Sequence, residues 1–258
     1  MSTAIAEPGR SPDPAASRWQ RIRTPGRLIT PLGVLLVLAG LFAWVATRDL
    51  DSIEQRTLNA EYIVTNTLQH AKITFVAGAL VVLIAIPLGV VASRSRVLAP
   101  VILALGNVGQ AVPVIGLMAM LTIVFGIGFT IAMVGIVLYA LLPTLRNTVV
   151  GLQQVDPATV EAARGVGMTD AQILRRIEFP LAVPVILAGL RTALVLCVGV
   201  AVLATFVNAG GLGDIIVNGI KLQRMTVLVT GSVLTAAIAL LVDWLGGLAE
   251  DLLRPRGM

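Results

Sequence analysis

Residues 97–145 read VLAPVILALGNVGQAVPVIGLMAMLTIVFGIGFTIAMVGIVLYALLPTL, a stretch without any Asp, Glu, Lys or Arg. A membrane-spanning helix needs about 20 consecutive, mostly apolar residues to cross the hydrocarbon core of a bilayer. The 49 uncharged residues from 97 to 145 therefore predict two crossings. Pairs of glycines commonly mark turns, so we expect the turn between the two crossings at Gly126-Ile127-Gly128.

Four further stretches with at most one charged residue lie on either side of this one. They cover residues 28–47, 73–93, about 184–207 and about 225–249. The chain of 258 residues is 57% hydrophobic and 13% charged, with a mean hydropathy of +0.92. Soluble domains carry about 25% charged residues, so the composition excludes an ordinary globular, disordered or collagen-like protein. We expect an all-α membrane protein with about six transmembrane helices.

The basic residues are distributed unequally between the two sides of the predicted membrane. If the N-terminus lies in the cytoplasm, 13 of the 19 Lys and Arg residues fall inside, 5 fall outside, and Arg191 falls within a span. Cytoplasmic loops of membrane proteins carry an excess of Lys and Arg, so this orientation, with both termini in the cytoplasm, is favoured. The net charge of +5 comes from residues that flank apolar runs, which predicts contact with a lipid bilayer and not with nucleic acid.

The segments outside the central spans have distinct compositions. Residues 1–27, rich in Pro, Ser and Arg, predict a disordered basic N-terminal tail, and residues 251–258 predict a short cytoplasmic tail. Residues 28–47 are longer than the apolar part of a signal peptide, and no small-residue cleavage site follows Ala46, so a retained helix is favoured over a cleaved signal. Residues 48–72 mix apolar and polar positions and predict an amphipathic segment on the outer surface.

The predicted cytoplasmic loop 151–183 begins with signals for a short helix. Asp156 supplies a side-chain acceptor for the first free backbone N–H groups, and Pro157 suits the first helical position. Glycine often ends a helix because it adopts the left-handed conformation without strain. We therefore expect the helix to end at Gly165 or Gly167.

A second short helix is predicted after that turn. Thr169 and Gln172 have the spacing of a capping box, and Pro180 and Pro184 are expected to break the chain before the next span. An apolar face outside the membrane must be covered, either by this protein's own bundle or by a groove on another protein, and the spacing leaves both alternatives open. The residues of that face are Ile173, Leu174 and Ile177.

This loop resembles the EAA loop of ABC importer membrane subunits, whose pattern is EAA-x3-G-x9-I-x-L-P. The only departure is Phe179, where the pattern has Leu. The resemblance implies a type I ABC importer permease fold in a core at 73–250, with one extra N-terminal helix at 28–47. In that family the loop binds the ATP-hydrolysing subunit. The resemblance thus implies an ATPase-coupling role for Glu161, Ala162, Ala163, Gly167, Ile177 and Pro180.

The same resemblance implies the partners and the location. They are ABC ATPase subunits, a second permease subunit, identical or homologous, and an extracytoplasmic substrate-binding protein, assembled at a prokaryotic plasma (inner) membrane. No phosphate-binding G-x-x-x-x-G-K-[ST] loop is present, since Lys72 follows Ala71 and Lys221 follows Ile220. We therefore expect a transporter subunit that is not an enzyme and has no cofactor, with ATP and Mg on the ATPase.

Three further strings narrow the family branch. Residues 86–100, 141–152 and 189–220 resemble permeases for osmoprotectants such as glycine betaine, choline and carnitine. The chain departs from those permeases at Asn208, where relatives often have Gly, so another small solute, an amino acid or a sulfonate, is the alternative substrate. Proteins usually bind quaternary amines in aromatic cages, and only 4% of the residues are aromatic. Selectivity is therefore expected on the binding protein.

Four residues are candidates for the translocation path. Gln110-Ala111-Val112-Pro113, with Asn107 nearby, interrupts the third predicted span, and Asn208 precedes a glycine-rich turn. Broken helices often line transport pathways, although a proline can also mark a simple packing kink. These alternatives stay open. The candidate residues are Asn107, Gln110, Pro113 and Asn208.

The remaining charged or reactive residues give weaker signals. Arg191, about two turns into the fifth span, is expected to extend to the cytoplasmic interface, with pairing to an acid or a carbonyl as the alternative. GLGD at 211–214 matches a string of intramembrane aspartyl proteases, but that chemistry needs two facing carboxylates, and Asp243 is the only other acid near a span. One histidine and one cysteine predict neither a metal site nor a disulfide.

Overall fold

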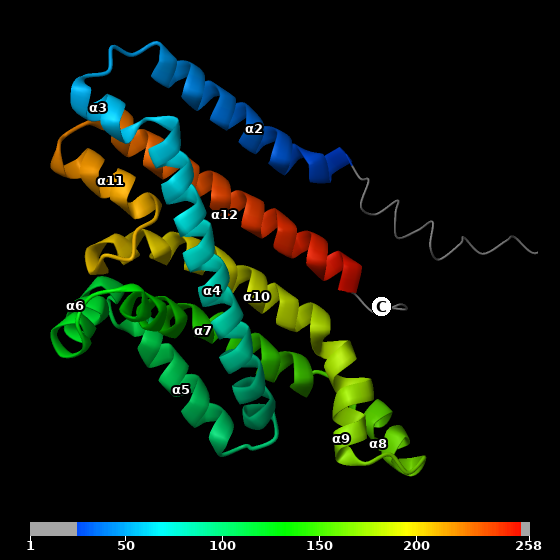
Figure 1. The fold of residues 1–258 in the computed structure, drawn as a ribbon. Coiled ribbons are helices and arrows are strands. Elements are labelled where there is room, and N and C mark those ends of the chain that lie inside the picture. The colour runs from blue at the N-terminus through cyan, green and yellow to red at the C-terminus, as the bar shows by residue number, and fades with distance from the viewer. Residues whose placement is uncertain (1–24, 254–258) are drawn as a thin grey trace, which may run out of the picture.

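The computed structural model describes residues 25–253, which are almost entirely helical (Figure 1). The prediction for the N-terminal tail up to residue 24, and that for residues 254–258, lie outside the described residues. In the first half of the chain the helices are α2 (Pro25–Ala46), α3 (Ser52–Thr57), α4 (Ala60–Ser93), α5 (Leu98–Ala111), α6 (Val114–Phe125) and α7 (Phe129–Gln153). In the second half they are α8 (Pro157–Gly165), α9 (Asp170–Ile173), the π-helix η1 (Leu174–Glu178), α10 (Phe179–Ala201), the 3-10 helix η2 (Val202–Val207), α11 (Leu212–Lys221) and α12 (Met225–Leu253).

Five of the described helical segments are long and apolar enough to cross a membrane. A sixth crossing is possible if α5 and α6, which meet at a bend of 92°, count together as one broken span. The predicted all-α membrane fold with about six spans is therefore confirmed. The turn expected at Gly126-Ile127-Gly128 is confirmed as well, because α6 ends at Phe125 and α7 begins at Phe129.

The bend between α5 and α6 has a local cause. A residue before proline is pushed out of the α-helical region, and Val112 adopts an extended conformation with φ −77° and ψ 130°. Pro113 has no backbone N–H, so it cannot continue the hydrogen-bond ladder. Neither α5, with 14 residues, nor α6, with 12, reaches the length of a straight span.

The outer segment before the second span differs from the expectation. Residues 60–72 do not form a separate amphipathic segment, because α4 begins at Ala60 and continues to Ser93. The Asn59 side chain accepts from the Tyr62 backbone N–H at 2.8 Å and caps this earlier start. The polar residues that suggested a surface segment include Asn66 and His70, which are buried against the rest of the bundle at 3% and 0% exposure.

The short helix α3 is held at one end of the bundle by Asp51. Asp51 and Glu54 form a capping box, and Asp51 also pairs with Arg224, just before α12, at 2.8 Å. The Glu54 backbone N–H, which donates to Asp51 at 2.8 Å, lowers the pKa of that carboxyl, and Arg224 acts in the same direction. The capping box and the ion pair of Asp51 together hold the segment between α2 and α4 in place.

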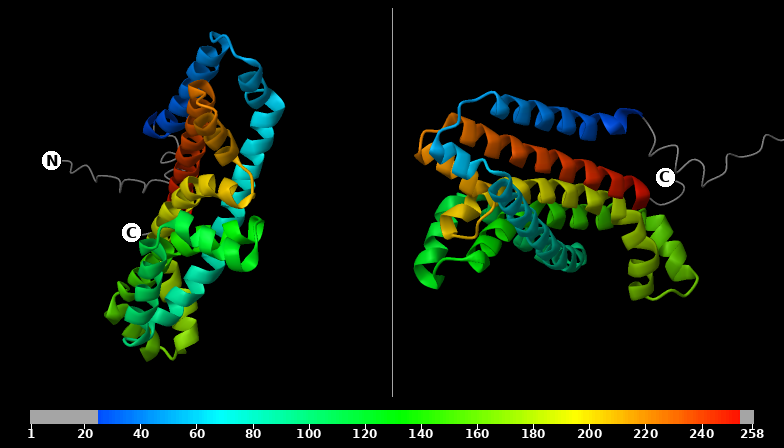
Figure 2. Two further views of the ribbon diagram at one scale, coloured as in Figure 1. Left: turned by 90° about the vertical axis from the view of Figure 1, so that its left-hand side faces the viewer. Right: turned by 45° about the horizontal axis from the view of Figure 1, so that its top comes forward.

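The N-terminal helix α2 lies along α12 (Figures 1 and 2). It buries a narrow stripe that includes Val34 and Leu41, while Leu35 and Leu36 are exposed.

The remaining bundle is built around α7, which contacts both α4 and α10. Its main apolar cluster is made largely of small and β-branched side chains, which allow the helices to approach closely, and includes Ile73, Ala77, Val81, Ile136, Ala140, Ala193 and Cys197.

Arg191 does not extend alone to the interface, so the favoured prediction is wrong. Its guanidinium donates to the Asp243 carboxylate on α12 through Nε at 2.6 Å and through Nη2 at 2.5 Å. A charge within an apolar span is costly unless it is paired, and this pairing satisfies both residues. The side-chain stem of Arg191 packs against Gly246 of α12 and its guanidinium against Gly247, where larger residues would meet them.

Candidate functional site

The loop between α7 and α10 projects from one end of the bundle. In Figure 2 its two short helices, coloured yellow-green, extend away from the spans, and Figure 1 places them at the opposite end from α3 and α11. The first of them, α8, starts as predicted. Asp156 caps it by accepting from the Ala158 backbone N–H at 3.0 Å, and Pro157 takes the first turn.

The turn after α8 is built around Gly167. This residue has φ +87°, a left-handed conformation that glycine adopts without steric cost. The Met168 N–H donates to the Ala163 carbonyl at 3.1 Å and the Gly167 N–H to the Arg164 carbonyl at 2.9 Å. These two bonds are those of a Schellman motif. Of the two predicted terminators, Gly167 is therefore the residue that ends the helix.

The second short helix begins as predicted and ends differently. Thr169 and Gln172 form the expected capping box, with bonds of 3.4 and 2.9 Å. The predicted break at Pro180 and Pro184 is wrong, because α9, η1 and α10 form one helical segment from residue 170 to 207. Pro180 lies in the first turn of α10, where a missing N–H costs little, and Pro184 is accommodated inside the helix.

The loop covers part of its apolar surface with this protein's own bundle. Ile173 is 2% exposed and Leu174 packs against the cluster formed by Leu152, Ala182 and Ile186. Self-packing, one of the two alternatives left open, therefore accounts for this face. An exposed apolar side chain remains at Val166, the residue directly after α8, which is 80% exposed.

The residues implied by the EAA resemblance do not form one compact cluster. Glu161 and Ala162 are exposed on α8, whereas Ala163 is buried against the bundle. Gly167 lies exposed in the turn. The last two residues follow on the second helical segment: Ile177 in η1, partly buried, and Pro180 in α10, exposed.

A half-buried ion pair at the base of this loop was not predicted. Glu178, at the end of η1, is 6% exposed, and both its carboxylate oxygens accept from Arg94, the residue that caps the end of α4. The Arg94 Nη1 to Glu178 Oε1 distance is 3.1 Å. The two residues are 84 positions apart, and neither lies in a local pattern that would have indicated the pairing.

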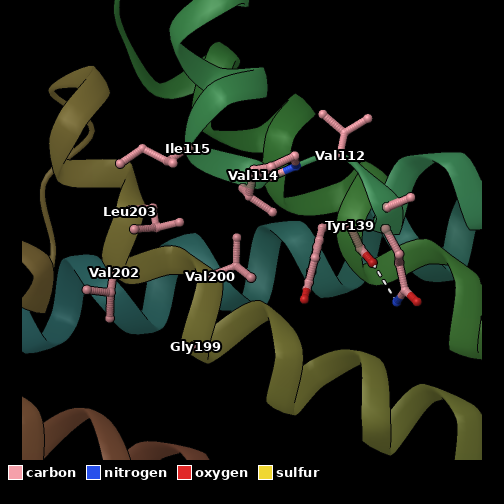
Figure 3. Close-up of a pocket in the computed structure, with 11 residues that line it drawn as sticks. Val112, Val114, Ile115, Tyr139, Gly199, Val200, Val202 and Leu203 are labelled. Atoms are coloured by element: carbon pink, nitrogen blue, oxygen red, sulfur yellow. Dashed lines mark hydrogen bonds between the residues drawn. The ribbon is translucent and has the colours of Figure 1, made fainter.

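A cavity of about 500 Å³ lies where the bend between α5 and α6 faces α7 and α10 (Figure 3). The Gln110 Nε2 donates to the backbone carbonyl of Tyr139 at 3.0 Å and fixes the bend against α7. The lining contains no charged side chain; it consists of Gln110, Ala111, Val112, Pro113, Val114, Ile115, Tyr139, Gly199, Val200, Val202 and Leu203.

The four pathway candidates are thus divided. Gln110 and Pro113 line the cavity, whereas Asn107 is exposed on α5 outside the lining. Asn208 lies exposed at the end of η2, where it adopts a left-handed conformation with φ 58°. Sequence reasoning missed Tyr139 and the residues of α10 and η2 in the lining, since apolar residues in an apolar span carry no distinguishing signal.

The turn between η2 and α11, and the nearby end of α10, are held by α4. Gln69 accepts from the Gly211 N–H at 3.2 Å, and His70 Nε2 lies 3.1 Å from the Val198 carbonyl. Asp214 accepts from the Thr205 hydroxyl, while Asp243 is occupied by Arg191. The two carboxylates therefore have separate partners, which argues against the shared-proton pair of an aspartyl protease.

Comparison with known proteins agrees with this architecture. Residues 85–256 match the family described as binding-protein-dependent transport system inner membrane component. The chain is 40% identical to the carnitine transport permease protein OpuCD of Listeria monocytogenes over 79% of this chain and 92% of that protein. It is 38% identical to the glycine betaine/carnitine/choline transport system permease protein OpuCD of Bacillus subtilis over 76% of this chain and 86% of that protein.

A solved structure has the same fold. A chain of the MetNI methionine ABC transporter in an inward-facing conformation aligns with a TM-score of 0.67 at 25% identity. The alignment covers 74% of this chain and 96% of that chain. The family match begins at residue 85, so α2, α3 and the first part of α4 precede it.

Proposed function

This chain belongs to the binding-protein-dependent transport system inner membrane component family and is a permease subunit of an ABC importer, and we propose that its substrates are quaternary amines of the glycine betaine, choline and carnitine type. The observation that carries the substrate proposal is the 40% identity to a carnitine permease over 79% of the chain. The alternative is another small solute, such as an amino acid, which the similarity to a methionine transporter supports at lower identity.

The cavity at the bend fits this substrate class. Its volume of about 500 Å³ accommodates a small solute, and its lining has no fixed charge. Glycine betaine and carnitine are zwitterions without net charge and need no counter-ion, whereas choline is a cation and would favour a buried opposite charge, which is expensive within a membrane. Within the proposed class the uncharged lining therefore favours the two zwitterions. Tyr139 is the one aromatic side chain in the lining, fewer than an aromatic cage uses, which supports selection by the binding protein.

The projecting loop supports the proposed assembly. ATPase subunits would dock on the exposed face of α8 and on the turn at Gly167, and would supply ATP and Mg, so this chain needs no cofactor of its own. A second permease subunit would complete the pathway, and an extracytoplasmic binding protein would deliver the substrate. In a prokaryotic plasma membrane this arrangement puts the α8 end and both termini in the cytoplasm.

Reconstituted transport tests the substrate. We expect proteoliposomes that contain the permease, its ATPase and its binding protein to accumulate labelled glycine betaine, choline or carnitine only when ATP is supplied. Labelled methionine and taurine are the controls, since they represent the amino acid and sulfonate alternatives. Accumulation of a control without any of the three amines would contradict the substrate proposal and leave the importer function intact.

Cysteine labelling tests the orientation. The single native cysteine, Cys197, is fully buried, so it contributes little background. We expect Ser52→Cys, on exposed α3, to react with a membrane-impermeant maleimide in intact cells. Ala171→Cys, on exposed α9, should react only after the membrane is opened. The reverse pattern would show that the charge distribution was misread and that the loop faces outward.

A further inference from the structure

The proposed coupling loop, residues 151–183, continues into the membrane-spanning helix α10 without a break in the helix. The helix that begins at Asp170 continues through η1 into α10 and ends at Val207, so no loop interrupts it. A push on α9 from outside the bundle is therefore passed directly to α10. We call this continuous helix, residues 170–207, the α10 lever. The response of the other helices depends on the contacts that the lever makes close to α9.

Within the lever, the π-helical turn η1 lies between α9 and α10. A π-helix adds a residue to the helical turn, and such turns often occur at functional sites. The Phe179 N–H donates to the Leu174 carbonyl five residues earlier, which closes the widened turn. This is the point at which the axis of the lever can change direction most easily, because the backbone ladder departs from regular α-helical spacing there.

The last residue of this turn carries a buried charge. Glu178 is 6% exposed and lies beside an apolar cluster to which Ile86 and Val90 of α4 also contribute. A carboxylate in such surroundings requires a partner, and Arg94 at the end of α4 donates two hydrogen bonds to it. The Arg94 side chain is 45% exposed, so the pair lies at the edge of the bundle.

We propose that the Arg94–Glu178 ion pair is a positioning contact that passes movement of the coupling loop from the α10 lever to α4. This assignment rests on the proposed function, in which ATPase subunits push on the loop. A two-pronged arginine fork fixes direction as well as distance, unlike a point contact. Because α4 packs against both α7 and α10, its displacement would rearrange the helices that surround the cavity.

The test compares neutral variants of the pair in the assembled transporter. Glu178→Gln and the double variant Arg94→Gln with Glu178→Gln remove the ion pair without leaving a charge buried and unpaired. Arg94→Lys keeps the charge but loses the two-pronged geometry. Arg96→Gln is the matched control, since Arg96 lies two residues further along and makes no ion pair within residues 25–253.

Three quantities are measured for each variant: the ATPase subunit retained on purification, the melting temperature, and the substrate imported per ATP hydrolysed. We expect the first two to stay near the wild-type values in the double variant. Import per ATP should fall well below the wild-type value, because ATP hydrolysis would continue while movement of the loop no longer displaces α4. Arg94→Lys should lie between the wild type and the double variant, and Arg96→Gln should match the wild type.

The outcomes separate this assignment from the proposed function. Wild-type import per ATP in the double variant would overturn the positioning role alone. So would a loss of import that only follows a loss of folded, ATPase-bound complex, since that result indicates a purely structural pair. Failure of the wild-type chain to retain an ATPase at all would overturn the proposed function, and the positioning role with it.

Discussion

Gly213→Ala is expected to prevent accumulation of a folded permease. A Cβ atom at this position would lie 2.1 Å from the Val202 carbonyl oxygen and 3.0 Å from its carbon. Both are backbone atoms of η2, so no side-chain rotation can make room for the methyl group. Overpacking commonly costs about 1–3 kcal/mol, and a clash with backbone belongs at or above the upper end of that range.

The measurement is the yield and melting temperature of monodisperse protein in detergent. Gly40→Ala is the matched control, because its Cβ on α2 would meet nothing within 4 Å. Alanine favours a helix over glycine by roughly 0.5–1 kcal/mol, so the control should be neutral or slightly stabilising. Wild-type yield and melting temperature for Gly213→Ala would show that η2 and α11 do not approach as closely as described.

The spans were predictable because charged residues are expensive in a bilayer and therefore mark where crossings end. The same signal could not predict how a crossing is broken. Residues 97–125 satisfy the length rule for one span, yet the backbone turns by 92° near Pro113. The proline indicated an interruption, but the angle depends on contacts such as that between Gln110 and the Tyr139 carbonyl, which sequence does not encode locally.

The start and the turn of the loop between α7 and α10 were predictable because their signals are local. The caps at Asp156 and Thr169 and the turn at Gly167 each depend on residues within a few positions of one another. Pairings between distant residues were not predictable. Arg191 and Asp243 are 52 positions apart and belong to different helices, so periodicity along either helix contains no information about the other.

The start of α4 illustrates a third kind of error. The polar residues at 60–72 predicted a surface segment, because polar side chains usually face water. Asn66 is nevertheless buried, and its amide donates to the Tyr62 carbonyl one turn earlier at 2.9 Å. A polar side chain that satisfies its own helix, as Asn66 does, can be buried with much of the assumed cost offset. For His70 the offset is partial, because Nε2 lies within hydrogen-bond distance of the Val198 carbonyl whereas Nδ1 is buried without a partner among the described residues.

Gly167→Asp is expected to abolish association with the ATPase while leaving the permease folded and inserted. The Cβ would meet nothing within 4 Å, so the substitution causes no clash inside the subunit. With φ at +87°, an L-residue is strained by about 1–2 kcal/mol, and this strain is confined to the exposed turn. A carboxylate at the end of α8 also opposes the helix dipole, by about 0.3–1 kcal/mol.

The readout is the amount of ATPase that co-purifies with the permease, together with the yield and melting temperature of the permease itself. Gly167→Asn is the matched control, because asparagine has the same size, carries no charge and tolerates the left-handed conformation. We expect the asparagine variant to retain much of the ATPase and the aspartate variant to retain none. An aspartate variant that binds the ATPase normally would mean that the interface does not include this turn. The exposed residues of α8, with Glu161 and Ala162 among them, would then be the surface to test next.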